Sequence, residues 1–177
     1  MSVEQLKSRL GDCAKDTMLN LGTILTEDGA PGLNTVQIFG VALASAYATR
    51  NNDVSAALES EVAEKIDPAT IRAAKAAATI MAMNNVYYRF QHYVKDEELN
   101  KLTAKLRMTI IANPGIAKLD FELMSLAVSA INGCGMCMEA HTHELDKAGL
   151  GKPGIQSAIR IAAVINATAQ GVAINRG

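Results

Sequence analysis

Gly133-Cys134-Gly135-Met136-Cys137-Met138-Glu139-Ala140-His141 is the stretch around which this chain is organised. Two cysteines separated by two residues can close a small disulfide ring or supply half of a metal site. On a helix, Cys134, Cys137 and His141 occupy positions i, i+3 and i+7, so all three side chains project from one face. Gly133 lets the backbone turn just before them, and we therefore expect a helix to begin near Cys134.

Glu122 lies twelve residues before Cys134, in a run that is otherwise mostly apolar. Apolar residues nearly encircle the helix expected over residues 120–131, and such a helix is a buried one. A buried carboxylate either finds a partner or takes up a proton, and both outcomes suit proton transfer. The alternative is an exposed Glu122 near the helix start, where its charge favours the helix dipole. The remaining polar positions of this helix, Ser125, Ser129 and Asn132, form one narrow stripe with Glu122.

The composition of the 177 residues is typical of one soluble globular domain, which we expect to span residues 1–177. Hydrophobic residues make up 49% and charged residues 20%, so the chain needs no disulfide framework to build a core. A net charge of −1 does not point to nucleic acid or to an anionic membrane as partner. Aromatic residues are scarce and alanine is common, which favours closely packed helices. We expect a compact, all-α, multi-helix fold.

The pattern of caps, breakers and apolar spacing predicts the helices in turn. Asn34 with Gln37 resembles a capping box, and Asp67-Pro68 is a strong start signal. Gly11 allows a break in the first helical region, and the runs 27–32 and 113–115 are turns. No strand pattern occurs. The expected helices cover residues 3–25 in one or two pieces, 34–50, 51–64, 68–93, one or two turns within 95–107, 120–131, 134–149 and 153–174.

The helix over residues 68–93 has an unusual end. Its expected buried stripe consists of Ala73, Ala76, Ala77, Ile80, Met83 and Tyr87. The tail from Asn84 to Phe90 is polar and aromatic together, so it either packs its rings at the helix end or lines a pocket or a subunit contact. His92, in the same tail, is interpreted as a surface or structural histidine.

Nothing in the sequence indicates export or membrane insertion. The residues after Met1 lack the apolar core of a signal peptide, and no apolar run approaches the roughly 18 residues of a membrane span. We therefore expect a cytoplasmic protein, in which a Cys-x-x-Cys pair is catalytic or metal-binding rather than structural. Cys13 is interpreted as an inert, half-buried thiol and His143 as a solvated side chain.

Three kinds of chemistry fit the cysteine cluster. In thiol redox catalysis a thiolate attacks a peroxide, forms a sulfenic acid and condenses with the second cysteine to a disulfide, while Glu122 and His141 handle protons. In a zinc site, Cys134, Cys137 and His141 would be joined by Glu122 or His143. A structural zinc site usually takes a second ligand pair from elsewhere, and this chain has no second Cys-x-x-Cys. In the third case the cysteines merely pack within a helical interaction module.

One spaced motif resembles the signature of the alkyl hydroperoxidase D family, within the carboxymuconolactone decarboxylase-like fold. It consists of Glu122, eleven residues, Cys134-x-x-Cys137, three residues and His141. The likeness covers nearly the whole chain, because further runs also resemble that family: Ala48–Asn51, Met83–Arg89, Leu106–Ile116 and Phe121–Cys134. Decarboxylase members of the wider fold lack the cysteine pair, which argues against that activity.

The resemblance implies an all-α antioxidant enzyme, usually a homotrimer, that reduces alkyl hydroperoxides without a bound cofactor. It also implies a disulfide adaptor, which receives electrons from the dihydrolipoyl group of a lipoyl-bearing protein and passes them to the peroxiredoxin component of alkyl hydroperoxide reductase. By the same match, Cys137 forms the sulfenic acid or the mixed disulfide, Cys134 resolves it, and Glu122 and His141 form the proton relay.

Two features of the sequence disagree with what the resemblance implies. Helix-terminus electrostatics alone favour Cys134, nearer the N-terminus, as the more acidic thiol. Well-known family members carry a second histidine between the two cysteines, where this chain has Met136. Without that histidine we expect a relay that depends more heavily on Glu122 and His141, and a slower peroxidase. Comparing the thiol pKa values before and after Met136→His tests this expectation.

Overall fold

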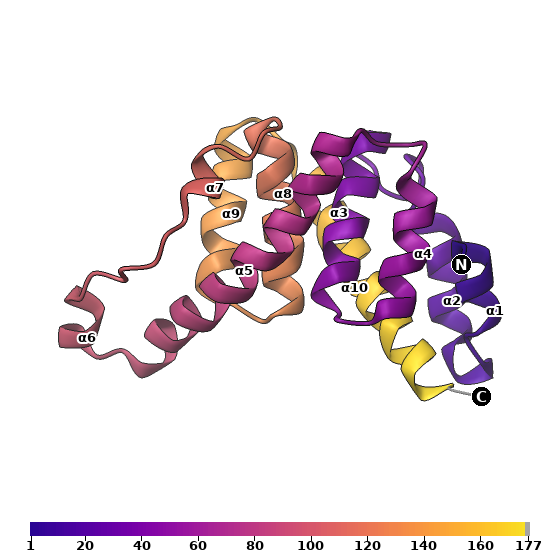
Figure 1. Cartoon of the computed structure of the whole chain (residues 1–177), viewed down its shortest axis with the longest axis horizontal. Helices are drawn as coiled ribbons and strands as arrows, with labels where there is room; N and C mark the ends of the chain where they lie inside the picture. Colours follow the sequence, from indigo (N-terminus) through magenta and orange to yellow (C-terminus); the bar gives the residue numbers. More distant parts are fainter. Residues whose placement is uncertain (176–177) are drawn as a thin grey trace.

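Helices form all of the regular structure in residues 1–175, the part of the chain that the computed structural model describes, and no strand occurs there (Figure 1). This confirms the all-α expectation. The elements are α1 (Val3–Ser8), the 3-10 turn η1 (Asp12–Ala14), α2 (Lys15–Ile24), α3 (Thr35–Ala48), α4 (Asn52–Val62), α5 (Pro68–Val94), α6 (Glu97–Lys101), α7 (Thr109–Ala112), α8 (Lys118–Ile131), α9 (Gly135–Lys147) and α10 (Lys152–Ile174).

The structure confirms the predicted start signals of α3 and α5. Asn34 and Gln37 form a reciprocal capping box at the start of α3. The Asp67 carboxylate accepts a hydrogen bond from the Thr70 N–H at 2.7 Å, and this bond lowers the pKa of Asp67. Pro68 follows at the first helical position, where its missing N–H costs nothing. α8 begins at Lys118, two residues before the predicted start.

α8 is the central helix of the fold. It contacts α3, α5, α9 and α10, and all nine residues from Phe121 to Ser129 are buried, as its apolar surface predicts. Small residues let the helices approach closely. At Gly40 of α3 a Cβ atom would lie only 2.5 Å from the Met124 methyl of α8, so a larger residue would force the Met124 side chain to move.

α10 is a core helix, although it is the one helix within residues 1–175 that is long and apolar enough to cross a membrane by length and composition. It packs against α2, α3 and α8. Half of its most apolar window is buried inside the protein, which accounts for its apolar composition.

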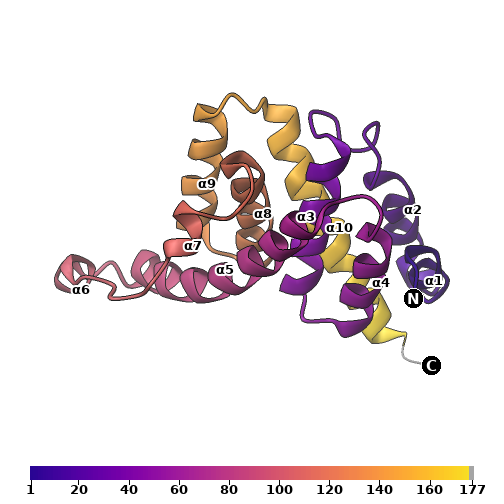
Figure 2. The same cartoon turned by 45° about the horizontal axis from the view of Figure 1, so that its top comes forward.

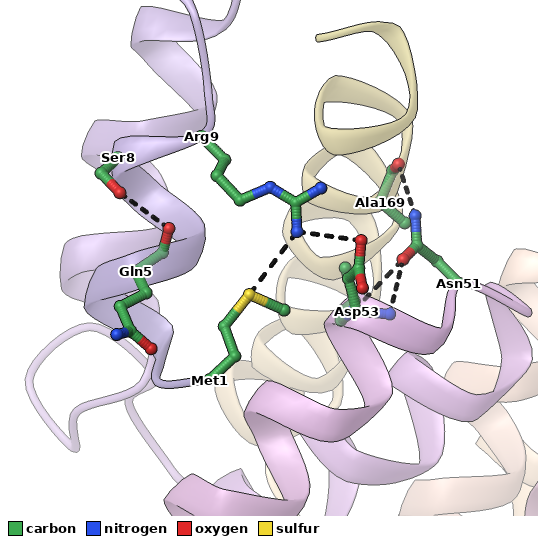
Figure 3. A network of polar contacts seen from close by, with 8 residues as sticks. Met1, Gln5, Ser8, Arg9, Asn51, Asp53 and Ala169 are labelled. Atoms are coloured by element: carbon green, nitrogen blue, oxygen red, sulfur yellow. Dashed lines mark hydrogen bonds and ion pairs between the residues drawn. The ribbon is translucent and has the colours of Figure 1, made fainter. Parts of the chain in front are cut away.

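Polar contacts join the N-terminal region to the body (Figure 3). The Arg9 guanidinium pairs with Asp53 of α4 at 2.9 Å and also lies 3.5 Å from the Met1 sulfur. The amide of Asn51, which caps α4, donates to the Ala169 carbonyl of α10 at 3.1 Å. Because the Arg9–Asp53 pair is partly exposed, it contributes at most about 1 kcal/mol, and apolar packing holds α1 in place.

The end of α5, α6 and the following extended segment project from the body (Figures 1 and 2). We call residues 86–107 the arm. α6 has no buried residue, in agreement with the charged composition of this region. The arm nevertheless exposes seven large apolar side chains: Val86, Phe90, Tyr93, Val94, Leu99, Leu102 and Leu106.

Two predictions about buried residues are wrong. The buried face of α5 includes Met81, Asn84 and Asn85. Four residues of the predicted stripe are only partly buried: Ala76, Ile80, Met83 and Tyr87. Asn85 has polar partners in Ser129 of α8 and in Asn132 directly after α8, which allows that face to turn inward. Cys13, expected to be half-buried, is exposed on the turn η1.

Candidate active site

The two cysteines of the quoted stretch form a disulfide at the start of α9. Cys134 is the N-cap of the helix rather than part of it, and Cys137 lies in its first turn, with 5.3 Å between the two Cα atoms. Gly133 adopts a left-handed conformation with φ of 70°, which ends α8 and places Cys134 at the cap. The Cys137 N–H points at the Cys134 sulfur at 3.4 Å. A thiolate at Cys134 would therefore be stabilised by a backbone donor and by the helix N-terminus.

Glu122 and His141 form a buried pair beside the disulfide. The Glu122 Oε2 and His141 Nδ1 atoms are 2.6 Å apart, and the two side chains are only 6% and 11% exposed. The alternative of an exposed Glu122 is wrong, because this side chain points inward from α8 towards α9. A carboxyl and an imidazole at this distance share a proton readily, which is what an acid–base relay requires.

A cavity of about 280 Å³ opens beside the disulfide. We call it the cysteine cavity. Its wall is mostly apolar and combines α5, α7 and α9 through Met81, Asn84, Tyr88, Met108, Ile111, Met136, Cys137, Ala140 and His141. Cys137 reaches this wall, whereas Cys134 is fully buried behind it. The second ring nitrogen of His141, Nε2, lies 3.3 Å from the Met81 sulfur on the same wall.

Glu122 also borders a separate cavity of about 300 Å³, which we call the glutamate cavity. Lys118, Leu119, Glu144, Lys147 and Ala148 complete its lining. Lys118 and Glu144 pair across it at 2.9 Å; the pair raises the pKa of Lys118 and lowers the pKa of Glu144. The Glu122–His141 pair thus connects two cavities that have no lining residue in common.

Hydrogen bonds from α5 fix the turn that carries the cysteines. The Arg89 guanidinium donates to the Asn132 carbonyl at 2.6 Å, directly before Gly133. The Asn132 amide donates to Asn85, which in turn donates to the Ser129 hydroxyl, each at 2.9 Å. The Cys134 N–H donates to the Ser129 carbonyl at 3.1 Å. Sequence reasoning placed Ser129 and Asn132 on one stripe but missed that α5 binds this stripe.

The polar and aromatic tail of α5 lines a pocket, which was one of the predicted alternatives. Asn84 and Tyr88 both lie on the wall of the cysteine cavity, and the Tyr88 hydroxyl lies 3.9 Å from the Met108 sulfur. His143 is exposed, as predicted, and His92 is exposed too, which was one of its two interpretations. Within residues 1–175, no three His, Cys, Asp or Glu side chains are arranged to hold a metal ion.

An all-helical protein with a Cys-x-x-Cys disulfide beside a buried carboxyl–imidazole pair has the elements of a thiol–disulfide oxidoreductase. Residues 97–174 match the Carboxymuconolactone decarboxylase family. The chain is 56% identical over 168 residues to the alkyl hydroperoxide reductase AhpD of Coxiella burnetii (strain RSA 493 / Nine Mile phase I), which covers 95% of each chain. It is 53% identical over 169 residues to the protein of the same name from Rhodospirillum centenum, covering 96% of this chain and 89% of that protein.

A third relative, from Brucella abortus, has the same name and is 49% identical over 169 residues, covering 96% of this chain and 95% of the relative. The chain therefore belongs to the alkyl hydroperoxide reductase AhpD family, as the resemblance in its sequence indicated.

Proposed function

We propose that this protein reduces alkyl hydroperoxides by a thiol-based reaction at Cys134 and Cys137, with Glu122 and His141 as its proton relay. The observation that carries the proposal is the shared cavity wall: Cys137 and His141 face one mostly apolar cavity, and Cys134 lies behind them within disulfide reach. An apolar cavity suits the organic part of an alkyl hydroperoxide.

The oxidative half of the cycle begins with the reduced pair. The Cys137 thiolate attacks the terminal oxygen of the hydroperoxide; an S–O bond forms, the O–O bond breaks, and the sulfur loses two electrons to the peroxide. The leaving alkoxide takes a proton from His141 and departs as the alcohol. Cys134 then attacks the Cys137 sulfenic acid, so the S–S bond forms and water leaves.

The reductive half uses the same geometry in the opposite direction. A dithiol attacks Cys137, the sulfur that reaches the cavity, and Cys134 leaves as a thiolate. The Cys137 N–H and the start of α9 stabilise that thiolate, and a more stable thiolate leaves faster. This arrangement supports Cys137 as the sulfur that forms mixed disulfides and Cys134 as its resolving partner.

Protons are proposed to enter through the glutamate cavity. Glu122 borders this cavity, and its partner His141 borders the cysteine cavity, so a proton can pass from one side to the other through the 2.6 Å contact. Met136 stands on the wall where a second histidine would be expected, and it supplies no acid–base group. The relay proposed here accordingly relies on Glu122 and His141.

The proposed reductant is a dihydrolipoyl group on a lipoyl-bearing protein, and the proposed acceptor is the peroxiredoxin component of an alkyl hydroperoxide reductase system. Both exchanges need free thiols, which persist in a reducing compartment such as the cytoplasm. No bound cofactor is needed for this cycle, because the two sulfurs carry both electrons.

The arm is the proposed contact for a homotrimer. Its seven exposed apolar side chains form a surface that a solitary soluble protein rarely presents to water. Phe90→Asp in the arm is expected to convert the trimer to monomers in light scattering. The exposed apolar Leu19 on α2 lies outside the arm, so Leu19→Asp serves as the control and should leave the trimer intact.

The test of the function is thiol counting under hydroperoxide. Cys13 is exposed and would add an unrelated thiol, so the experiment uses Cys13→Ser throughout. Cumene hydroperoxide should consume two thiols per chain and release one alcohol per disulfide, and dihydrolipoamide should restore both thiols. Unchanged thiols under excess hydroperoxide would refute the proposal. Stoichiometric zinc that protects both thiols would instead support the zinc site predicted as an alternative.

A further inference from the structure

Asn84 carries a buried polar atom that no other part of the protein satisfies. Its side chain lines the cysteine cavity together with Cys137 and His141, and the residue is only 4% exposed. The Oδ1 atom is buried and has no hydrogen-bond partner. Leaving a buried carbonyl unpaired costs about 1–3 kcal/mol, so such groups are rare without a functional reason.

The neighbouring asparagine, Asn85, differs from Asn84 because its side chain is hydrogen-bonded within the protein. Asn85 accepts a hydrogen bond from Asn132 and donates one to Ser129, so both ends of its amide help to hold the cysteine turn. Asn84 is one residue away on the same helix but faces the cavity between Met81 and Tyr88, which are mainly apolar neighbours. One amide is thus part of a structural network, and the oxygen of the other has no protein partner.

We propose that Asn84 binds the hydroperoxide: its Oδ1 accepts the hydrogen bond from the peroxide O–H. This inference rests on the proposed function and adds a residue that recognises the reacting group. An alkyl hydroperoxide has a single O–H donor, and Asn84, a residue of this cavity wall, carries a buried acceptor without a protein partner. Rotation of the amide about its Cβ–Cγ bond turns this oxygen towards the cavity. The apolar remainder of the wall receives the alkyl group, and the amide N–H₂ of Asn84 remains available as a donor.

This contact orients the oxygen that reacts. With its O–H held by Asn84, the terminal peroxide oxygen is directed to the Cys137 thiolate, and the proximal oxygen becomes the leaving alkoxide that His141 protonates. The O–O bond breaks as the S–O bond forms, so the electron balance is that of the cycle above. Asn84 itself exchanges no electron and no proton, and its role is to position the substrate.

The decisive variant is Asn84→Leu, which keeps the number and branching of the side-chain heavy atoms but removes the acceptor. In the Cys13→Ser background, the second-order rate constant for oxidation of the reduced protein by cumene hydroperoxide should fall roughly tenfold to a hundredfold. The rate at which dithiothreitol reduces the disulfide should change by less than about threefold, because that step needs no peroxide contact. Asn84→Gln, which keeps the amide, should recover part of the loss.

Asn166→Leu on α10 makes the same chemical change at an exposed site and should leave both rates unchanged. If Asn84→Leu does not fold, Asn84→Ala should show the same selective loss of the oxidation rate. Equal oxidation rates in wild type and a folded Asn84→Leu or Asn84→Ala variant would overturn the inference, as would an equal loss in both half-reactions. A wild-type protein that does not react with hydroperoxide would overturn the proposed function itself.

Discussion

Replacing Glu122 by glutamine tests the relay with the smallest change of shape. The carboxylate lies 2.6 Å from His141 Nδ1, and both groups are almost fully buried. Glutamine keeps the length and an acceptor oxygen, so the imidazole can still form one hydrogen bond. What disappears is the negative charge and the ability to take up and release a proton.

The magnitude follows from the contact. A hydrogen bond to a charged group contributes about 1.5–3 kcal/mol, against about 0.5–1.5 kcal/mol for a neutral one. If the charged bond assists proton transfer in the transition state and the neutral one does not, the rate constant should fall roughly 10- to 150-fold. Such a loss lies at the lower end of what a general acid–base group contributes, because His141 itself remains in place.

The assay is stopped-flow oxidation of the reduced Cys13→Ser protein by cumene hydroperoxide. Glu144→Gln is the matched control, because Glu144 borders the same glutamate cavity but pairs with Lys118 at the surface. The control should stay within about threefold of wild type, since a surface pair contributes little. A Glu122→Gln protein with native helicity and an unchanged oxidation rate would refute the relay.

Three further predictions concern stability. Gly133→Ala in the reduced protein should lower the unfolding free energy by about 1–2 kcal/mol in urea, since no atom lies within 4 Å of the added methyl and only the positive φ is costly; no loss would contradict this. Arg89→Met keeps the apolar stem but loses the bond to the Asn132 carbonyl, and should cost about 1.5–3 kcal/mol by the same measurement; a loss below 0.5 kcal/mol would argue against the contact. Burial, followed by the hydrogen bond to Glu59, raises the pKa of Tyr47 well above its usual value. The stabilisation linked to Tyr47 is complete below about pH 10 and is lost as pH rises through the folded-state pKa, so the melting temperature should decline more steeply above pH 10 than in Tyr47→Phe; parallel declines would contradict it.

The helices and the four residues of the site were predictable because their signals are local. Capping residues act within three or four positions, and the cysteine pair with His141 occupies only eight residues. Glu122 could be predicted as buried because its helix is apolar on nearly every side. The exposure of Cys13 was not predictable in this way, because the orientation of a single 3-10 turn leaves little trace in composition.

Residues far away in the sequence decide which face of α5 is buried. Its central part is rich in alanine, so two adjacent faces have similar hydrophobicity, and periodicity could not choose between Ile80 and Met81. The partners that turn Asn85 inward lie 44 and 47 residues later. A pair of asparagines in an apolar helix was the available signal, and it became interpretable once α8 was placed beside α5.

The proposed division of labour between the two sulfurs combines the effects of the helix cap and the cavity. Helix-terminus electrostatics favour a thiolate at Cys134, whereas the cavity gives access to Cys137. These preferences conflict only if the more acidic thiol must also be the attacking one. In disulfide exchange the sulfur under attack must be reachable and the departing sulfur must be stable as a thiolate. A cysteine at the N-cap followed by one in the first turn meets both demands, and the buried Cys134 is then protected from reactions other than closure onto Cys137.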